Sequence, residues 1–237
     1  MLYCQVVSVS NPETVTLPLL VMMWAMSISS HAQNGADPES MRRFKLLAPE
    51  QMTEAQKQLA QSIRSGPRAG VAGSAANNTV LGSPFNVFLR SPEVGEHLQQ
   101  VGSYIRFKSS LGAKLNEFAI LITARHWGAQ YEWHAHHRLA LQAGLNPAIA
   151  QEVAQGRRPA GMSDEEAAIY DFSNELHTHR QVSDDTYQKV VSRFGEQGVM
   201  DLIAVNGYYT LIAMVLNVDR TPIPGGGPAP LPPLSGR

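Results

Sequence analysis

The chain has 237 residues, of which 43% are hydrophobic and 16% are charged. This composition is typical of a globular protein and favours a single domain around one core. Nineteen Lys and Arg residues against twenty Asp and Glu residues give a formal net charge of -1. The chain therefore has no overall positive field to attract nucleic acid or an anionic membrane surface, and we expect neither as a partner of the mature protein.

The first feature in chain order is an apolar run over residues 17–30, which is too short to span a bilayer comfortably. It is followed by Ser30-His31-Ala32, which places small residues at the -3 and -1 positions of a cleavage site. The pattern predicts a signal peptide over residues 1–32, cleaved near Ala32, and a periplasmic or secreted protein. The alternative is a buried or disordered leader on a cytoplasmic protein, since residues 1–16 lack the basic residues of a usual signal peptide.

The single cysteine, Cys4, lies before the predicted cleavage site. The mature chain would therefore contain no thiol, which excludes disulfides and thiol catalysis. Residues 33–48 are polar and loosely patterned, and they predict an extended arm. Residues 221–237 are rich in Pro and Gly and predict a flexible tail, because such a segment sustains neither a helix nor a ladder of hydrogen bonds. A proline-rich ligand for another module is the alternative for this tail.

Helix signals dominate residues 49–220, which we expect to form one helical domain. Apolar residues recur at helical spacing, and N-cap residues, a capping box at Ser163 and stops at Gly128 and Gly144 divide the pattern. The predicted helices cover residues 50–65, 91–109, 111–127, 131–143, a segment from 147, 163–177, a segment from 183, and 196–216. No apolar run shows the alternation of a strand, so the predicted fold class is all-α.

Residues 129–138 concentrate histidines, a carboxylate and aromatic side chains next to the most apolar predicted helix. Glu132 and His136 are four residues apart and share one helix face, where the carboxylate can orient the imidazole. His134 and His137 lie on another face, where exposed or subunit-contact histidines are more common than catalytic ones. For Trp133 the first interpretation is a core or interface residue, and the second is a residue of the pocket wall.

Glu117 lies within the apolar run 115–124, where an ionised carboxylate is costly unless it is paired. A buried acid beside a histidine cluster is a candidate proton-transfer group. The structural alternative is that Glu117 neutralises Arg125 or another buried base. A metal site is also conceivable, because imidazole and carboxylate suit zinc or iron. No two of these histidines have the i, i+4 spacing of a helical metal pair, so we predict no metal, although His134 and His137 could coordinate one at i, i+3 with a third ligand from elsewhere.

The segments 117–125, 129–136 and 139–145 together resemble the superfamily of carboxymuconolactone decarboxylase and alkylhydroperoxidase D (AhpD). Its redox branch carries a Glu, then a C-x-x-C pair, then a His four residues later. Glu117 and His136 match that Glu and His, whereas Ala129 and Glu132 occupy the two cysteine positions. The similarity extends through residues 206–217 and covers most of residues 45–222. It implies an AhpD-like helical bundle that forms a homo-oligomer, a trimer or a hexamer.

The missing cysteines decide between the branches, because peroxide reduction in the redox branch needs two thiols. The resemblance then implies a decarboxylase-like enzyme that acts without a cofactor on a small carboxylated, lactone-like molecule. In our hypothesis His136 donates a proton, Glu132 orients it, and Glu117 maintains its protonation. The expected substrate-binding residues are Arg125, Tyr131, Trp133, His137 and Tyr209.

Two alternatives remain open at this point. One is an oxidoreductase in the peroxidase sense of the superfamily, with or without a metal. The other is a non-catalytic helical oligomer that binds a small molecule or a partner. An export signal is unusual for an enzyme of aromatic degradation, which normally proceeds in the cytoplasm, so the natural substrate is left open.

Overall fold

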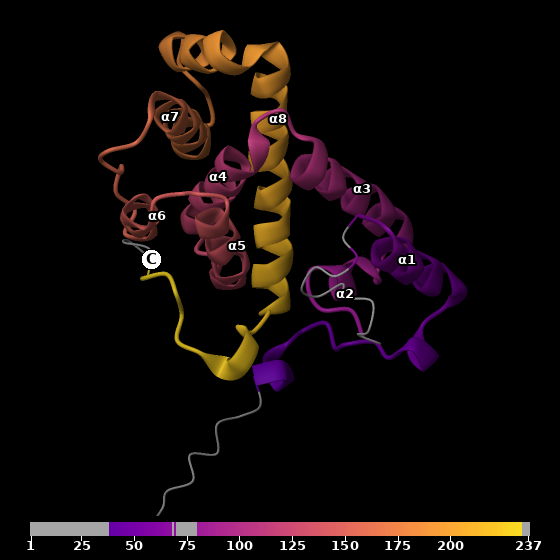
Figure 1. Ribbon diagram of the computed structural model, residues 1–237. Helices are drawn as coiled ribbons and strands as arrows, with labels where there is room; N and C mark the ends of the chain where they lie inside the picture. The colour runs from indigo at the N-terminus through magenta and orange to yellow at the C-terminus, as the bar shows by residue number, and fades with distance from the viewer. Residues whose placement is uncertain (1–37, 68, 70–79, 234–237) are drawn as a thin grey trace, which may run out of the picture. The chain divides into compact units, whose positions relative to one another are not determined.

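The computed structural model describes residues 38–67, 69 and 80–233 of the chain (Figure 1). The signal peptide predicted over residues 1–32 lies outside these residues. In the described part of the chain all regular structure is helical, as expected. The α-helices are α1 (Glu54–Ser65), α2 (Phe85–Phe88), α3 (Pro92–Lys108), α4 (Gly112–Trp127), α5 (Gln130–Gln142), α6 (Pro147–Ala154), α7 (Asp164–His179) and α8 (Asp184–Asp219). Three short 3-10 helices cover Pro38–Met41, Pro49–Gln51 and Pro224–Gly226.

Capping residues set most of these boundaries where the sequence predicts them. Ser163 and Glu166 form the expected capping box of α7, and Asn146 accepts a hydrogen bond from the backbone at the start of α6. Gly128 ends α4 in the left-handed conformation, at φ 58°. The first predicted helix begins later than residue 50, because Thr53 and Gln56 cap each other and start a new helix at residue 54. The short helix α2 was not predicted.

Helix α8 changes direction at Gly195, whose φ of 67° and ψ of -179° are accessible to glycine and strained for other residues. The break divides α8 into the two helices that the sequence predicts from residue 183 and over 196–216. By length and apolarity α8 is the one helix in the described residues that could cross a membrane, but 56% of its most apolar window is buried. Its apolar face is used to pack against α4 and α7.

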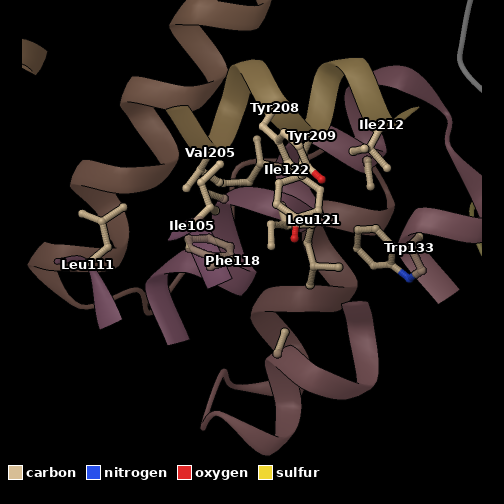
Figure 2. Close-up of a cluster of buried hydrophobic side chains, with 14 of the residues drawn as sticks. Ile105, Leu111, Phe118, Leu121, Ile122, Trp133, Val205, Tyr208, Tyr209 and Ile212 are labelled. Carbon is tan, nitrogen blue, oxygen red and sulfur yellow. The ribbon is translucent and has the colours of Figure 1, made fainter. Parts of the chain in front are cut away.

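Helix α4 is the centre of the core. Residues 115–124 are all buried, and α4 packs against α5, α7 and α8. Figure 2 shows Phe118, Leu121 and Ile122 of α4 beside Tyr209 and Ile212 of α8. Helices α1, α2 and α3 lie on the other side of α8 from α5, α6 and α7 (Figure 1). Because residues 115–124 of α4 are buried on every side, a charged group in this stretch is costly unless it finds a partner inside the fold.

The corner between α3 and α4 is fixed by side chains from elsewhere. Ser110 donates hydrogen bonds from its backbone N–H and its hydroxyl to Asp201 Oδ2 of α8, both at 2.7 Å. Asn116 Nδ2 donates to the carbonyl oxygen of Ile105 at 2.6 Å. These bonds satisfy polar groups at the end of α3 and hold the last turn of this helix against α4 and α8.

The predicted N-terminal arm is docked from residue 38 onward. Arg42 is buried and donates to Asp219 Oδ2 and to Ser83 Oγ, each at 2.6 Å. Ser83 in turn donates to the same carboxylate oxygen at 2.9 Å. The network joins the arm, the segment before α2 and the end of α8. A buried charge pair of this kind is costly to break, because either partner alone would be an uncompensated buried charge.

The C-terminal segment differs from the flexible tail that its composition predicts. Leu231 is 2% exposed, and its backbone N–H and carbonyl are both bonded to the side-chain amide of Gln130, at 2.9 and 3.1 Å. The carbonyl of Pro232 accepts a hydrogen bond from Arg125 Nη1 at 2.7 Å. Prolines cannot donate, but their carbonyls accept, and α4 and α5 supply the donors. Residues 221–233, here called the C-terminal strap, are therefore anchored to the helices at Leu231 and Pro232, whereas residues 224–230 are exposed.

A polar network away from the cavity described below gives the fold a pH dependence. His177 of α7 is hydrogen-bonded to Thr123 of α4 at 3.0 Å and stacks on His126, with ring centroids 4.9 Å apart. Burial, and then the charge of His126, lower the pKa of His177 to about 4. In the unfolded chain a histidine has a pKa of about 6.5. Stability is therefore complete above pH 6.5 and is lost as the pH falls toward 4, because the unfolded chain binds the extra proton.

We expect the substitution His177→Gln to reduce this acid sensitivity, since an amide can bond to Thr123 and does not titrate. At about 1.4 kcal/mol per pKa unit, the wild-type protein should lose roughly 2–3 kcal/mol more than the variant between pH 7 and pH 4. Urea denaturation at the two pH values measures the difference. The exposed His179→Gln variant should behave like wild type. Equal acid losses for wild type and His177→Gln would contradict the assignment.

Candidate active site

A cavity of about 360 Å³ lies between α3, α5 and α8. Residues 83–85 and Pro224 complete its wall. Its apolar lining includes Phe85, Leu139, Ile212 and Leu216, and its polar lining consists of Ser83, Arg106, Tyr131, Glu132, His134, His136, Arg138, Tyr208 and Tyr209. A mostly apolar cavity with a few converging polar groups is the usual form of a small-molecule site.

A line of three side chains runs from the core to this cavity. His136 Nδ1 of α5 is 2.6 Å from Glu117 Oε2 of α4. On the other side of the ring, His136 Nε2 is 3.4 Å from Glu132 Oε1. The three side chains are 10% exposed or less. Both imidazole nitrogens therefore face a carboxyl group, and Glu117, which is not part of the lining, is the inner end of the line.

The surroundings of Glu132, the outer acid, favour its protonated form. Burial, and then the charge of Glu117, raise the pKa of Glu132 well above its ordinary value, and Arg106 opposes this only in part. Glu132 Oε2 is buried and has no hydrogen-bond partner among the described residues. Nδ1–H of His136 donates to Glu117, and Nε2 faces Glu132 Oε1 at 3.4 Å without forming a hydrogen bond. The Glu117 carboxylate thus fixes the Nδ1–H tautomer of the imidazole.

Tyr209 of α8 covers the imidazole from the cavity side of the core. Its ring meets the His136 ring edge to face, with centroids 5.0 Å apart and an interplanar angle of 82°. Burial, and then the charge of Glu117, raise the pKa of Tyr209 well above 10. The phenol therefore keeps its proton at neutral pH and can offer it as a hydrogen bond to a bound molecule.

The structure brings together five of the residues predicted for the site. Glu117 and His136 are in direct contact, and Glu132, Tyr131 and Tyr209 line the cavity with His136. The i, i+4 relation of Glu132 and His136 and the burial of Glu117 were the two signals that indicated this arrangement. Both nitrogens of His136 face a carboxyl group, Nδ1 at 2.6 Å from Glu117 and Nε2 at 3.4 Å from Glu132.

Three predicted substrate-binding residues lie outside the cavity lining. Arg125, in the last turn of α4, bonds to the C-terminal strap instead. Trp133 is 3% exposed and belongs to the core, and His137 stacks on it with ring centroids 5.7 Å apart. For Trp133 and His137 the physical reason is helix periodicity, because the residue directly after Glu132 or His136 lies about 100° further round α5, on the side away from the cavity.

Sequence reasoning missed the cations of the cavity. Arg106 near the end of α3 and Arg138 of α5 line it, together with the exposed His134. Only the helical phase of α5 could have indicated Arg138 and His134. Nothing local marks Arg106, because it meets the acids through tertiary packing. In the described parts of the chain, no group of three His, Cys, Asp or Glu side chains is arranged to hold a metal ion.

No protein-family model and no curated protein sequence matches this chain. The chain is similar in structure to a protein of unknown function from Agrobacterium tumefaciens, described as a candidate antioxidant defence protein AhpD. The two share 15% sequence identity with a TM-score of 0.53, and the match covers 59% of this chain and 96% of the other. The expected fold is confirmed: the chain has an AhpD-like helical fold.

Proposed function

We propose that this protein is a cofactor-free acid–base enzyme, a decarboxylase-like lyase that acts on a small carboxylated cyclic molecule of lactone type. The observation that carries the proposal is the line Glu117–His136–Glu132, which joins a buried carboxylate through an imidazole to a protonated acid in the cavity wall. Such a line can deliver a proton to a bound molecule and be recharged from behind.

The chemistry can be written with these groups alone. The bond to the departing carboxyl carbon breaks, and its electron pair enters a conjugated carbonyl to give a dienolate and carbon dioxide. The carboxyl proton of Glu132 then passes to the dienolate carbon. His136 takes up a proton from solvent, stabilised by Glu117, and returns it through Nε2 to Glu132. One proton is consumed for each carbon dioxide released, so the enzyme ends in its starting state.

This order exchanges the roles that the sequence suggested for His136 and Glu132. His136 Nδ1 is held by Glu117 and lies behind Glu132 in the line, whereas Glu132 belongs to the cavity wall. The acid is therefore the group that meets the substrate, and the imidazole is its proton supply. Tyr131 and Tyr209, which also line the cavity, are placed to hold the dienolate oxygen.

A thiol mechanism has no support in this chain. Its single cysteine, Cys4, cannot form the C-x-x-C pair of the redox branch, and position 132 carries an acid.

The proposal also includes export after cleavage near Ala32, which rests on the sequence, and a homo-oligomer of three or six subunits. Exposed apolar side chains on α3 and α8 support an oligomer: Val94, Val101, Tyr104 and Phe107 on α3, and Met200, Ile203, Met214 and Val218 on α8.

The experiment is a panel of small β-keto and vinylogous carboxylic acids, including carboxylated unsaturated lactones. Carbon dioxide release and peroxide loss are followed in parallel, with His136→Ala as the control. We expect carbon dioxide release from at least one lactone acid, none with His136→Ala, and no peroxide loss. Peroxide loss without decarboxylation would favour the oxidoreductase alternative. If His136→Ala matched wild type in both assays, the site assignment would be wrong.

A further inference from the structure

The cavity holds a guanidinium that the acid–base chemistry does not use. Arg106 lines the cavity and its side chain is 14% exposed. Its one ion pair is with Glu117 Oε1 at 3.9 Å, which is too long for a hydrogen bond. None of the other residues described in the structure accepts a hydrogen bond from this guanidinium. The guanidinium donors are therefore available in the cavity wall, where a bound anion can accept hydrogen bonds from them.

The charge of the lining favours an anion. Arg106 and Arg138 are the two permanent cations of the cavity wall, and Glu132 is its one acid in the described residues. Because two permanent cations face one acid, the lining carries a net positive charge whether or not Glu132 is ionised. Arg106 is also close enough to both Glu132 and Tyr209 for its charge to oppose part of the rise in their pKa values. The side chains of Arg106, Glu132 and Tyr209 therefore face the same cavity.

We propose that Arg106 binds a carboxylate of the ligand, one that is retained through the reaction, so that the substrate is a small cyclic dicarboxylate held with its ring beside Glu132, and a monocarboxylate binds as product or as an unreactive analogue. The chemical class follows from the planar, two-pronged geometry of guanidinium, which matches a carboxylate. The statement that the carboxylate is retained rests on the proposed function. The statement that Arg106 binds a carboxylate rests only on the residues of the cavity.

The retained character of this carboxylate follows from the energetics of decarboxylation. A guanidinium held against the departing carboxylate would stabilise the ground state and slow the loss of carbon dioxide. A guanidinium on a second carboxylate instead fixes the ring and leaves the departing group free to lose its charge. The anchor therefore also binds product, and it binds carboxylates that cannot react.

The test uses benzoate as probe and benzamide, its neutral isostere, as control. Neither compound is a substrate of the proposed reaction. Isothermal titration calorimetry with the full-length protein is expected to show benzoate binding and much weaker benzamide binding. Arg106→Gln should weaken benzoate binding roughly 10–100-fold, as expected for a charge-assisted two-pronged contact. Arg138→Gln, which removes the exposed cation, should weaken it less than about threefold.

Two further variants keep the test decisive. Glu117→Gln removes the carboxylate that competes for Arg106, so it should bind benzoate at least as tightly as wild type. Arg106→Lys keeps the positive charge and loses the two-pronged guanidinium geometry, so its benzoate affinity should fall between those of wild type and Arg106→Gln. If the glutamine variant does not fold, the lysine variant provides the test. Equal binding of benzoate and benzamide, no benzoate binding at millimolar concentration, or unchanged binding by both Arg106 variants would overturn the proposal. Benzoate binding through Arg106 without any decarboxylation in the panel would leave the anchor in place and remove the lyase.

Discussion

The substitution His136→Asn is expected to lower kcat on any acid that the protein decarboxylates by roughly 10²–10⁴-fold, the usual contribution of a positioned proton-transfer group. The imidazole is the link between Glu117 and Glu132, at 2.6 and 3.4 Å. An asparagine is too short to replace both contacts. His137→Asn is the matched control, because the neighbouring ring stacks on Trp133 outside the cavity lining, and it should retain most of the activity.

A second variant tests whether the residues act as one unit. Glu117→Gln should also lower kcat, since it removes the carboxylate that supports the charged imidazole. If the line works as proposed, the double variant of Glu117→Gln and His136→Asn should be no slower than the slower single variant. Independent, multiplicative losses would show that the two residues serve different functions. Circular dichroism of each variant establishes that it is folded.

The substitution Glu132→Gln is expected to abolish activity and to stabilise the protein at alkaline pH. An amide cannot deliver the proton, so decarboxylation should fall at least 10²-fold. Because burial raises the pKa of Glu132, stability from its neutral form is complete below the unfolded pKa of about 4.3 and is lost as pH rises through the folded pKa. Glutamine carries no such loss.

Urea denaturation of wild type and Glu132→Gln at pH 4 and pH 9 measures this effect. The difference in unfolding free energy should be small at pH 4 and should favour the variant at pH 9 by roughly 1–3 kcal/mol, the cost of an unsatisfied buried polar group. The titration of His177 is common to both proteins and cancels in the comparison. The exposed Glu165→Gln variant should match wild type at both pH values. A variant that is less stable than wild type at pH 9 would mean that Glu132 is ionised and paired in the folded protein.

The fold could be predicted largely from the sequence because its helices are marked by local signals. The capping box at Ser163 and the stop at Gly128 each act within a few residues of the chain. The two ends could not be predicted in this way. The docking of Arg42 on Asp219 and of Leu231 on Gln130 depends on segments that are distant in sequence, and composition reports only what a segment can do alone.

The candidate site was predictable to the extent that one helix carries it. Glu132 and His136 share a face of α5 through spacing alone, and the burial of Glu117 follows from its apolar neighbours. The position of Arg106 in the cavity wall depends on how α3 packs, and the position of Arg125 outside it depends on the C-terminal strap. No local sequence pattern indicates either position. The proposal that Glu132 is the proton donor needed the two distances from the His136 ring, which show the order of the three side chains from the core to the cavity.

The corner between α3 and α4 has a consequence for how such a protein can change over evolutionary time. The cation that would select the ligand is carried near the end of α3, and that end is secured by Asp201 and Asn116, neither of which belongs to the cavity lining. Substitutions at this joint can move the guanidinium toward or away from the acid while every reactive group stays in place. Descendants of this chain could thereby accept longer or shorter molecules and still perform the same proton chemistry.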